Sequence, residues 1–334
     1  MNNRAEALLQ IEDLTVTFPG QRTPVIQGLS LKLDRGEVLA LVGESGSGKS
    51  MTALSLTRLL PAGGEITGGR IRFDGQDVLS LSDRQMNRMR GGRMAMLFQQ
   101  PQAMLDPTSR VGTQITEPMR IHLGLGRRTA MARVPDLLSE VGIPDPAARA
   151  RCFSHELSGG MAQRVMMATA LSGEPQMLIA DEPTTALDVT VQAQILRLID
   201  EERRKRNLAT LLITHDLAVV AALADRVAVM YAGRIVEEGP AKAVLENPSH
   251  PYTRALMRCS LLVPDQSGEL LSIPGSGTDA REMTCGCRFH PRCSAAAQHG
   301  RDGRCARSEP ALEANPDGHS TRCWASETEK ETAA

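Results

Sequence analysis

The sequence predicts an α/β fold followed by a small cysteine-bearing region. Three short apolar runs support the α/β part, because each has the length of a buried strand: Val38–Val42, Met177–Ala180 and Leu211–Thr214. Each run is followed at once by glycine, acidic or histidine residues rather than by further apolar ones. The cysteine-bearing region is predicted because five of the seven cysteines follow residue 280.

Length and composition bound the possible classes of protein. A chain of 334 residues allows two domains. Hydrophobic residues at 41% and charged residues at 23% are typical of a soluble globular protein, and aromatics at 2% mean that aliphatic side chains and methionine fill the core. The net charge of -1 argues against a dedicated nucleic-acid binder. No apolar run is long enough to span a bilayer, and no signal-peptide core is present, so a cytoplasmic chain is expected.

The first apolar run leads into the segment "GESGSGKS" at residues 43–50, and a helix-forming stretch follows. This order of strand, glycine loop and helix is the context that the G-x-x-x-x-G-K-[ST] motif requires. Its glycines let backbone N–H groups turn toward phosphate oxygens, and the helix dipole adds to the attraction. Lys49 is expected to reach the β and γ phosphates, and Ser50 to hold Mg²⁺. An ordinary Gly/Ser connection is the alternative, which the combination of motif and context disfavours.

Four further residues follow apolar runs and can serve the same nucleotide. Asp181 ends the second run and can orient water on Mg²⁺, whereas Glu182 can accept a proton from an attacking water. His215, after the third run, can contact the γ-phosphate or that water. Gln99 follows the apolar residues of "MLFQQ" and can coordinate Mg²⁺ or position water. Taken singly, each has an ordinary alternative as an acidic turn, a surface histidine or a polar loop residue.

A second anion cradle is predicted at "LSGGM", residues 157–161, where a serine and two glycines open a helix. A plain helix N-cap is the ordinary interpretation of this segment. That interpretation leaves open why one nucleotide would need two cradles.

Taken in order, these motifs and the "ALD" of residues 186–188 resemble the ATP-binding subunit of ATP-binding-cassette (ABC) transporters, over roughly residues 8–258. The resemblance implies a P-loop NTPase core of the ABC ATPase type with an antiparallel edge sheet and a helical subdomain. It also implies that two such domains pack head to tail. Each ATP would then lie between the P-loop of one subunit, residues 43–50, and the signature segment of the other, residues 157–161. This explains the second cradle.

The resemblance assigns the site residue by residue. The residues implied to bind ATP in the same chain are Phe18, stacked on adenine, and Gly43, Glu44, Ser45, Gly46, Ser47, Gly48, Lys49, Ser50, Met51 and Asp181. Those implied to contact the partner's ATP are Ser158, Gly159, Gly160 and Asp188. The implied catalytic residues are Glu182, His215 and Gln99, and the implied Mg²⁺ ligands are Ser50, Gln99 and Asp181.

Other stretches resemble one branch, the oligopeptide, dipeptide and nickel importers: "ENPSHPYTRAL" at 246–256, "IPG" at 273–275, "GCRFHPRC" at 286–293 and "GHSTRCW" at 318–324. The chain departs from this branch after residue 275, where the expected prolines are missing. The predicted domains are an ABC ATPase domain at 1–258, with a helical insert at about 101–156, and a C-terminal extension at 259–334.

This branch implies several partners and a location. They are a second ATPase subunit in a homo- or heterodimer, two transmembrane permease subunits docking near the helical insert, and an extracytoplasmic solute-binding protein, with no nucleic acid. The chain is expected to be peripheral, on the cytoplasmic face of the inner membrane. Peptide is the expected cargo, with nickel or another small solute next.

The cysteines of the extension form a candidate metal site, with the set Cys287, Cys293, Cys305 and Cys323. Four thiolates suit Zn²⁺ or an iron–sulfur cluster, but the spacing lacks a C-x-x-C pair and does not choose between them. The resemblance favours a [4Fe-4S] cluster, with zinc or no metal as alternatives. Cys285 can take the place of Cys287 in this set.

Two competing functions remain at the level of sequence. One is a soluble switch ATPase of the same superfamily, acting in DNA repair or translation; the chain shows no second cassette or long coiled coil to support it. The other is an iron–sulfur regulatory protein that senses ATP without hydrolysing it, which Glu182 disfavours. The preferred interpretation is an ATPase subunit that energises import. One local expectation is also made: residues 61–69 form a turn-rich connection to a strand at "RIRFDG".

Overall fold

A computed structural model describes residues 7–185, 187–260, 272–275, 277, 279–283, 285–298, 302–314 and 318–324. The chain divides into two compact units, each assembled from separate segments. The helical unit comprises the described residues up to 8, 33–37 and 75–212. The P-loop unit comprises residues 9–32 and 38–74 and the described residues from 213 onward.

One sheet of the P-loop unit contains strands in the order β2-β1-β4, which are Ile26–Leu33, Leu9–Thr17 and Glu65–Phe73. Strands β1 and β4 are antiparallel, with Leu9 opposite Phe73. Side chains alternate between buried and partly exposed along β1, as expected for a strand with one covered face. This is the antiparallel sheet that the sequence predicts.

The other sheet of the P-loop unit has the order β11-β12-β10-β9-β3. Strand β3 is parallel to β9, and β10 is antiparallel to both β9 and β12. All five residues of β3 are buried, as expected for a parallel strand covered on both faces. The strands are β3 (Val38–Val42), β9 (Arg226–Tyr231), β10 (Arg234–Pro240), β11 (Glu313–Ala314) and β12 (Ser320–Thr321).

An aromatic cluster joins the C-terminal extension to this sheet. Tyr231 at the end of β9 packs on Tyr252 of α11, with ring centroids 4.6 Å apart, and Phe289 of the extension lies 5.3 Å and 5.5 Å from them. Both tyrosines of the chain are therefore in this contact. The helices of the unit are α1 (Lys49–Leu56), α9 (Leu217–Leu223), α10 (Ala241–Glu246), α11 (Pro251–Ser260), η2 (Asp279–Glu282), η3 (His290–Arg292), α12 (Ser294–Gln298) and α13 (Asp302–Arg307).

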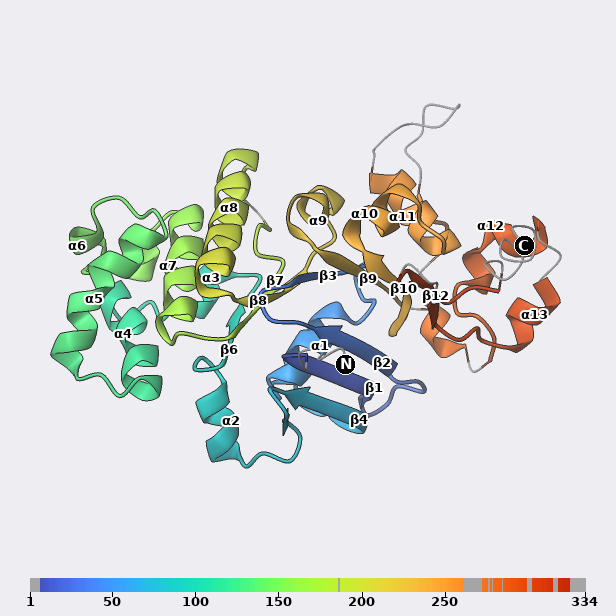
Figure 1. Cartoon of the computed structure of the whole chain (residues 1–334), viewed down its shortest axis with the longest axis horizontal. Helices are drawn as coiled ribbons and strands as arrows, with labels where there is room; N and C mark the ends of the chain where they lie inside the picture. Colours follow the sequence, from blue (N-terminus) through green and yellow to red (C-terminus); the bar gives the residue numbers. More distant parts are fainter. Residues whose placement is uncertain are drawn as a thin grey trace, which may run out of the picture. The chain divides into compact units, whose positions relative to one another are not determined.

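The helical unit contains strands in the order β8-β7-β6, which are Ala209–Ile213, Met177–Asp181 and Met94–Leu97. Helix α7 (Gly159–Ser172) packs against α3, α4 and α5, so these helices form one group (Figure 1). The remaining elements are β5 (Gln76–Asp77), α2 (Asp83–Met89), α3 (Pro101–Met104), α4 (Val111–His122), α5 (Arg127–Glu140), α6 (Pro146–Arg149), η1 (Ser154–Glu156) and α8 (Val189–Arg206).

Local sequence explains where the longer helices begin and end. Ser82 and Gln85 form a capping box at the start of α2. Ser158 and Asp188 accept N–H groups at the starts of α7 and α8. Asn207, in the left-handed region with φ of 51°, ends α8. None of the helices within the described residues combines the length and apolar character needed to cross a bilayer.

One local expectation is wrong. Strand β4 begins at Glu65, so most of the stretch 61–69 is a strand rather than a turn-rich connection. Gly69 has φ of +89°, and a Cβ there would lie 2.5 Å from the carbonyl oxygen of Glu12. The register of β1 also shifts between Glu12 and Thr15. The glycine therefore serves a strand irregularity, as glycines in strands often do, instead of ending the strand.

Candidate functional site

The predicted phosphate-binding loop lies between β3 and α1. Gly43, Gly46 and Gly48 all have positive φ, at 150°, 77° and 113°. A Cβ at Gly43 would collide with the carbonyl oxygen of Met230, and one at Gly48 would lie 2.6 Å from the Met230 Cε. Both backbone conformation and space therefore require glycine at these positions.

Two buried polar groups of the loop fit an anion. The Lys49 side chain is buried, and its Nζ donates to the carbonyl oxygens of Gly43 at 2.8 Å and Glu44 at 3.0 Å. The Ser47 hydroxyl is buried and has no hydrogen-bond partner among the described residues. A buried hydroxyl without a partner is costly unless a ligand completes it. A phosphate oxygen would supply the acceptor, so these residues fit the triphosphate that the motif implies.

The other predicted residues of the P-loop unit lie at the ends of strands. Phe18 follows β1, and its ring packs against Gly64, where a Cβ would lie 2.8 Å from the ring. His215 follows β8 and is exposed. Asp216 next to it caps α9 by accepting the N–H of Ala218 at 2.8 Å, which fixes the turn that carries the histidine. The adenine-stacking role of Phe18 and the catalytic role of His215 stay predictions.

The helical unit brings two predicted catalytic residues together. Gln99 Nε2 donates to Glu182 Oε2 at 2.8 Å, and Thr185 Oγ1 donates to the same oxygen at 2.8 Å. Glu182 has φ of 48°, so the chain turns sharply after β7, whose last residue, Asp181, is buried. The two hydrogen bonds orient the Glu182 carboxylate.

The signature segment is positioned by the start of helix α7. Ser158 Oγ accepts the N–H of Met161 at 3.4 Å, so its ordinary capping role is present. A Cβ at Gly160 would lie 2.7 Å from Val191 Cγ1, so a side chain there would force the Val191 side chain of α8 to shift. Gly159 lines a pocket of about 390 Å³ together with Gln99, Gln100, Pro101, Gln102, Ala103, Thr185 and Leu187. Two predicted site residues, Gln99 and Gly159, therefore share one cavity.

The "ALD" segment is only partly described, because Ala186 lies outside the described residues. Asp188 is exposed and accepts the N–H of Val191 at 3.0 Å, which caps α8. Its predicted contact with a partner's nucleotide stays a prediction beside this structural role.

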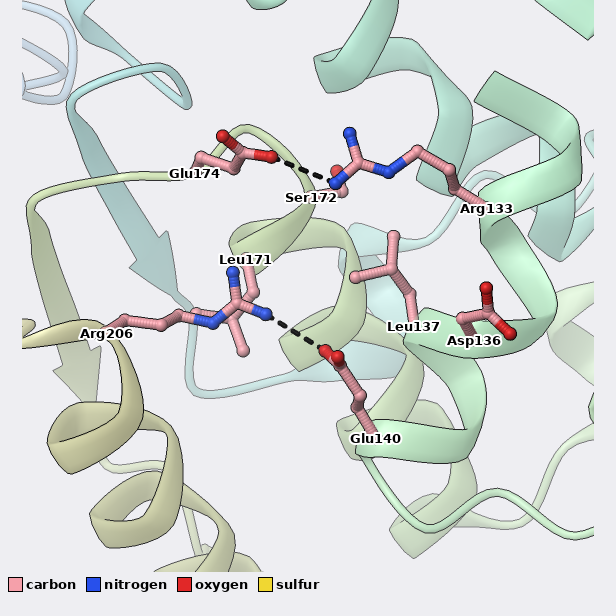
Figure 2. A pocket seen from close by; sticks show the side chains of 8 residues that line it. All are labelled: Arg133, Asp136, Leu137, Glu140, Leu171, Ser172, Glu174 and Arg206. Carbon is pink, nitrogen blue, oxygen red and sulfur yellow. Dashed lines mark hydrogen bonds and ion pairs between the residues drawn. The ribbon is translucent and has the colours of Figure 1, made fainter. Parts of the chain in front are cut away.

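A second pocket of the helical unit, of about 200 Å³, is lined mainly by charged side chains and contains none of the predicted site residues (Figure 2). Arg133 pairs with Glu174 at 3.0 Å, and Arg206 pairs with Glu140 at 2.9 Å. The Arg133 and Glu174 side chains are about half exposed, and such surface pairs contribute little to stability. We assign this pocket no role in nucleotide chemistry.

Cys287 lies near the other three predicted thiols of the extension. Burial, with smaller contributions from the neighbouring thiols of Cys305, Cys323 and Cys293, raises the pKa of Cys287 to about 12. Cys285 is exposed, with its Sγ 3.8 Å from the carbonyl oxygen of Ala306. Within the described residues, however, no three or more His, Cys, Asp or Glu side chains are arranged to hold a metal ion. The prediction of a metal or an iron–sulfur cluster is therefore not supported by this geometry.

Sequence reasoning missed two residues that hold the P-loop. The backbone N–H of Glu44 donates to Tyr252 Oη at 2.8 Å, and the Glu44 carboxylate pairs with Arg292 at 2.8 Å. Both partners belong to the segments "HPYTR" and "HPRC", which the resemblance identifies only as markers of the importer branch. The hydroxyl of Tyr252 and the charge of Arg292, within otherwise ordinary motifs, are the signals from which such a role can be suspected.

The fold and this site define a class, a P-loop ATPase. Two family models match the chain: "ABC transporter" over residues 26–185 and "Oligopeptide/dipeptide transporter, C-terminal region" over residues 236–299. The chain is 43% identical over 319 residues to the dipeptide transport ATP-binding protein DppD of Escherichia coli (strain K12), covering 95% of this chain and 96% of that protein. It is 42% identical over 322 residues to the oligopeptide transport ATP-binding protein OppD of Salmonella typhimurium, covering 96% and 94%.

The fold also has solved counterparts. The structure of cbiO1 from Clostridium perfringens, part of the ABC transporter complex cbiONQ, matches with a TM-score of 0.64 at 28% identity, covering 72% of this chain and 92% of that one. The chain belongs to the ABC transporter family, within the group of ATP-binding proteins of oligopeptide and dipeptide transporters. The predicted fold class and family are thereby confirmed, and the chain is an ATPase of this family.

Proposed function

We propose that this chain hydrolyses ATP to energise an importer for dipeptides or oligopeptides. The observation that carries the proposal is similarity over nearly the whole chain, extension included, to a dipeptide transport ATP-binding protein. A switch ATPase in DNA repair or translation is not favoured, because the C-terminal region matches the transporter group as well as the ATPase part does.

The residue roles that the resemblance implies belong to this proposal. The P-loop residues from Gly43 to Met51, with Phe18 and Asp181, bind ATP. Ser50, Gln99 and Asp181 would hold Mg²⁺, which would neutralise phosphate charge when bound. Glu182 accepts the proton of the attacking water, and His215 and Gln99 orient the reacting groups. Across a dimer, Ser158, Gly159, Gly160 and Asp188 contact the partner's ATP.

The assembly and location are also proposals. The ATPase domain spans residues 1–258 with a helical insert near 101–156, and the extension spans 259–334. The chain pairs with a second ATPase subunit and two permeases on the cytoplasmic face of the inner membrane, supplied by an extracytoplasmic binding protein. Exposed Met104 and Ile121, on α3 and α4, support docking of a permease at the insert.

A tagged pull-down from detergent-solubilised native membranes tests this assembly. Recovery of two multi-span permeases and a second ATPase, identified by mass spectrometry, is expected. Peptide uptake by the recovered complex in vesicles, dependent on MgATP and a binding protein, then tests the cargo. Recovery with ribosomes or DNA, and without permeases, would replace the importer by a switch ATPase.

A [4Fe-4S] cluster at Cys287, Cys293, Cys305 and Cys323 stays a separate prediction. Its support is the resemblance of the cysteine-bearing segments to the importer branch, because the described residues show no metal-binding arrangement. Anaerobic purification followed by iron, sulfide and zinc analysis decides it. Iron and sulfide in equal amounts are expected, zinc without sulfide would indicate a zinc site, and neither would remove the metal.

A further inference from the structure

The second residue of the P-loop is held by the C-terminal extension through a two-pronged ion pair. Arg292 Nη1 lies 2.8 Å from Glu44 Oε2, and Arg292 Nη2 lies 3.0 Å from Glu44 Oε1. The Arg292 side chain is only 6% exposed, and the Glu44 side chain 27%. Paired hydrogen bonds of this kind fix orientation as well as distance, and low exposure limits screening by water. The pair is therefore unlike the exposed salt bridges elsewhere on the chain.

Arg292 is itself fixed from several sides. Its Nε donates to the carbonyl oxygen of Pro274 at 2.6 Å, and Nη2 donates to that of Ile273 at 3.0 Å. Nη1 donates to Tyr231 Oη at 3.3 Å, and the guanidinium lies 5.7 Å from the Tyr231 ring centroid. The hydrogen bond with Glu44 raises the pKa of Arg292, so the guanidinium stays charged. The guanidinium that pairs with the P-loop residue Glu44 is therefore both charged and fixed in position.

Glu44 also connects this support to the phosphate-binding lysine. Its backbone N–H donates to Tyr252 Oη at 2.8 Å, and Tyr252 is fully buried in the aromatic cluster. Its carbonyl oxygen accepts from Lys49 Nζ at 3.0 Å. The side chain, N–H and carbonyl of one residue therefore link the extension, the ATPase core and Lys49. Displacement of Glu44 would move an acceptor of the lysine.

We propose that Arg292 is a positioning residue for ATP binding, through which the C-terminal extension braces the P-loop. The proposal rests on the proposed ATPase function. A loop already held in its binding shape loses less conformational freedom when the nucleotide binds, so the brace raises affinity. It acts on binding and leaves the hydrolytic step, which depends on other residues, unchanged.

A double-mutant cycle with the full chain tests the pair. Glu44→Gln and Arg292→Met each remove the ion pair with little change in side-chain size, and the double variant removes both partners. We expect each single variant to raise the Kd for MgATP by about tenfold. The double variant should raise it no further, because the same interaction is lost in all three. The kcat of Arg292→Met at saturating MgATP should stay within about twofold, because Arg292 is not among the residues that bind ATP.

Arg292→Lys and Arg322→Met sharpen the test. Lysine keeps the charge but not the paired geometry, so an intermediate Kd is expected. Arg322 also anchors the extension, donating to the carbonyl oxygens of Ile235 at 2.9 Å and Pro310 at 3.0 Å, and neither of these acceptors is in the P-loop. Its variant should leave the Kd within about twofold. Glu44→Gln keeps every contact of the extension except this pair. Its Kd for MgATP therefore tests the ion pair even where Arg292→Met unfolds the extension.

Three outcomes would overturn the proposal: an unchanged Kd in Arg292→Met, additive effects in the double variant, or an equal rise in Arg322→Met. The last would mean that docking of the extension as a whole, and not the ion pair, sets affinity. A wild-type chain that fails to bind MgATP would instead refute the proposed function. The two failures are therefore distinguishable in one titration series.

Discussion

At the scale of single residues, Glu182 is placed for its proposed work by two hydrogen bonds to one carboxylate oxygen. Gln99 and Thr185 both donate to Oε2. Two neutral donors orient a carboxylate without neutralising it, so it remains able to accept a proton. The left-handed backbone at Glu182 also indicates a fixed position, because a non-glycine residue keeps this conformation only when its surroundings hold it.

We predict that Glu182→Gln lowers kcat for ATP hydrolysis by roughly 10²- to 10⁴-fold, because glutamine cannot accept the proton. Glutamine keeps the size and most hydrogen bonds of glutamate, so nucleotide binding should persist. Phosphate release gives the rate, and size-exclusion chromatography in MgATP should show retained dimers.

Thr185→Val is the matched control for this variant, since it removes one hydrogen bond to the same oxygen and leaves the carboxylate. We expect it to retain turnover within about tenfold, the effect of one neutral hydrogen bond. Substantial hydrolysis by Glu182→Gln would remove Glu182 from the role of base.

At the scale of helices, the signature turn is limited by its neighbour α8. Alanine normally favours a helix over glycine by about 1 kcal/mol. At Gly160, however, a Cβ would lie 2.7 Å from Val191 Cγ1, whereas at Gly159 the nearest atom, of Leu187, is 3.9 Å away. Crowding of this kind costs about 1–3 kcal/mol.

We therefore predict that Gly160→Ala lowers the free energy of unfolding by about 1 kcal/mol, whereas Gly159→Ala leaves it unchanged or raises it. Urea unfolding of the two variants measures the difference. Val191→Ala should rescue Gly160→Ala, because it removes the obstructing methyl groups. Equal stabilities of the two glycine variants would show that contact with α8 does not decide the choice of glycine.

Asp188, at the start of helix α8, has two possible roles, helix capping and contact with a partner's nucleotide, and substitutions can distinguish them. Its cap on the Val191 N–H is worth about 1 kcal/mol, so Asp188→Ala should lower the free energy of unfolding by that amount. Asparagine caps a helix nearly as well, so Asp188→Asn should preserve stability. If Asp188→Asn nevertheless lowers ATP turnover, the carboxylate acts at the dimer interface. Full activity in Asp188→Asn would confine Asp188 to capping.

Short-range signals in the sequence predicted the elements that carry the nucleotide chemistry. Strands β3 and β7 coincide with the apolar runs, since five buried residues between turn formers leave few alternatives. The stretch 61–69 was mistaken because Gly68 and Gly69 are typical of turns, whereas here they sit within β4. The pairing of β4 with β1 is a long-range contact, and the local composition of residues 61–69 carries no information about such a partner.

At the scale of the whole molecule, the extension was predicted as a segment but not as a neighbour of the P-loop. Glu44 and Arg292 are 248 positions apart in the chain. Motif spacing reports residues that share a strand or helix, and it is silent about which segments meet in space. The four cysteines show the same limit. The sequence groups them by resemblance, and the described geometry does not arrange them as ligands of a metal ion.

The extension is also joined to the ATPase core by a buried polar network. Glu237 of β10 is fully buried and accepts the N–H groups of Ser249 at 2.6 Å and His250 at 3.0 Å. His319, next to β12, lies 2.6 Å from the same carboxylate. Burial raises the pKa of Glu237, but the hydrogen bonds, led by that of His319, outweigh burial and leave the pKa below its usual value. This carboxylate contributes stability above pH 4.5 and loses it below.

Protonation of His250 affects the stability at higher pH than protonation of Glu237 does, which allows a separate test. Burial lowers the pKa of its imidazole from 6.5 to about 4, against the attraction of Glu237. A hydrogen bond with the Arg322 backbone also raises the pKa of His250, whereas the charges of Arg322 and Arg254 lower it. The unfolded chain therefore takes up a proton between pH 6.5 and 4 that the folded chain does not. Stability is fully present above pH 6.5 and falls as the pH decreases through this window.

We predict that the free energy of unfolding decreases by about 2 kcal/mol between pH 7 and pH 5 on account of His250 alone. The Glu237 carboxylate stays ionised over this range, so it does not contribute to the slope. His250→Asn can keep the hydrogen bond in which the ring Nδ1 accepts the Tyr252 N–H at 3.0 Å, but it cannot titrate. Urea unfolding at pH 7, 6 and 5 should therefore show a shallower slope in the variant. A slope equal to that of the wild type would mean that His250 is accessible to protons, and that the junction of the extension with the core opens before the remainder of the chain unfolds.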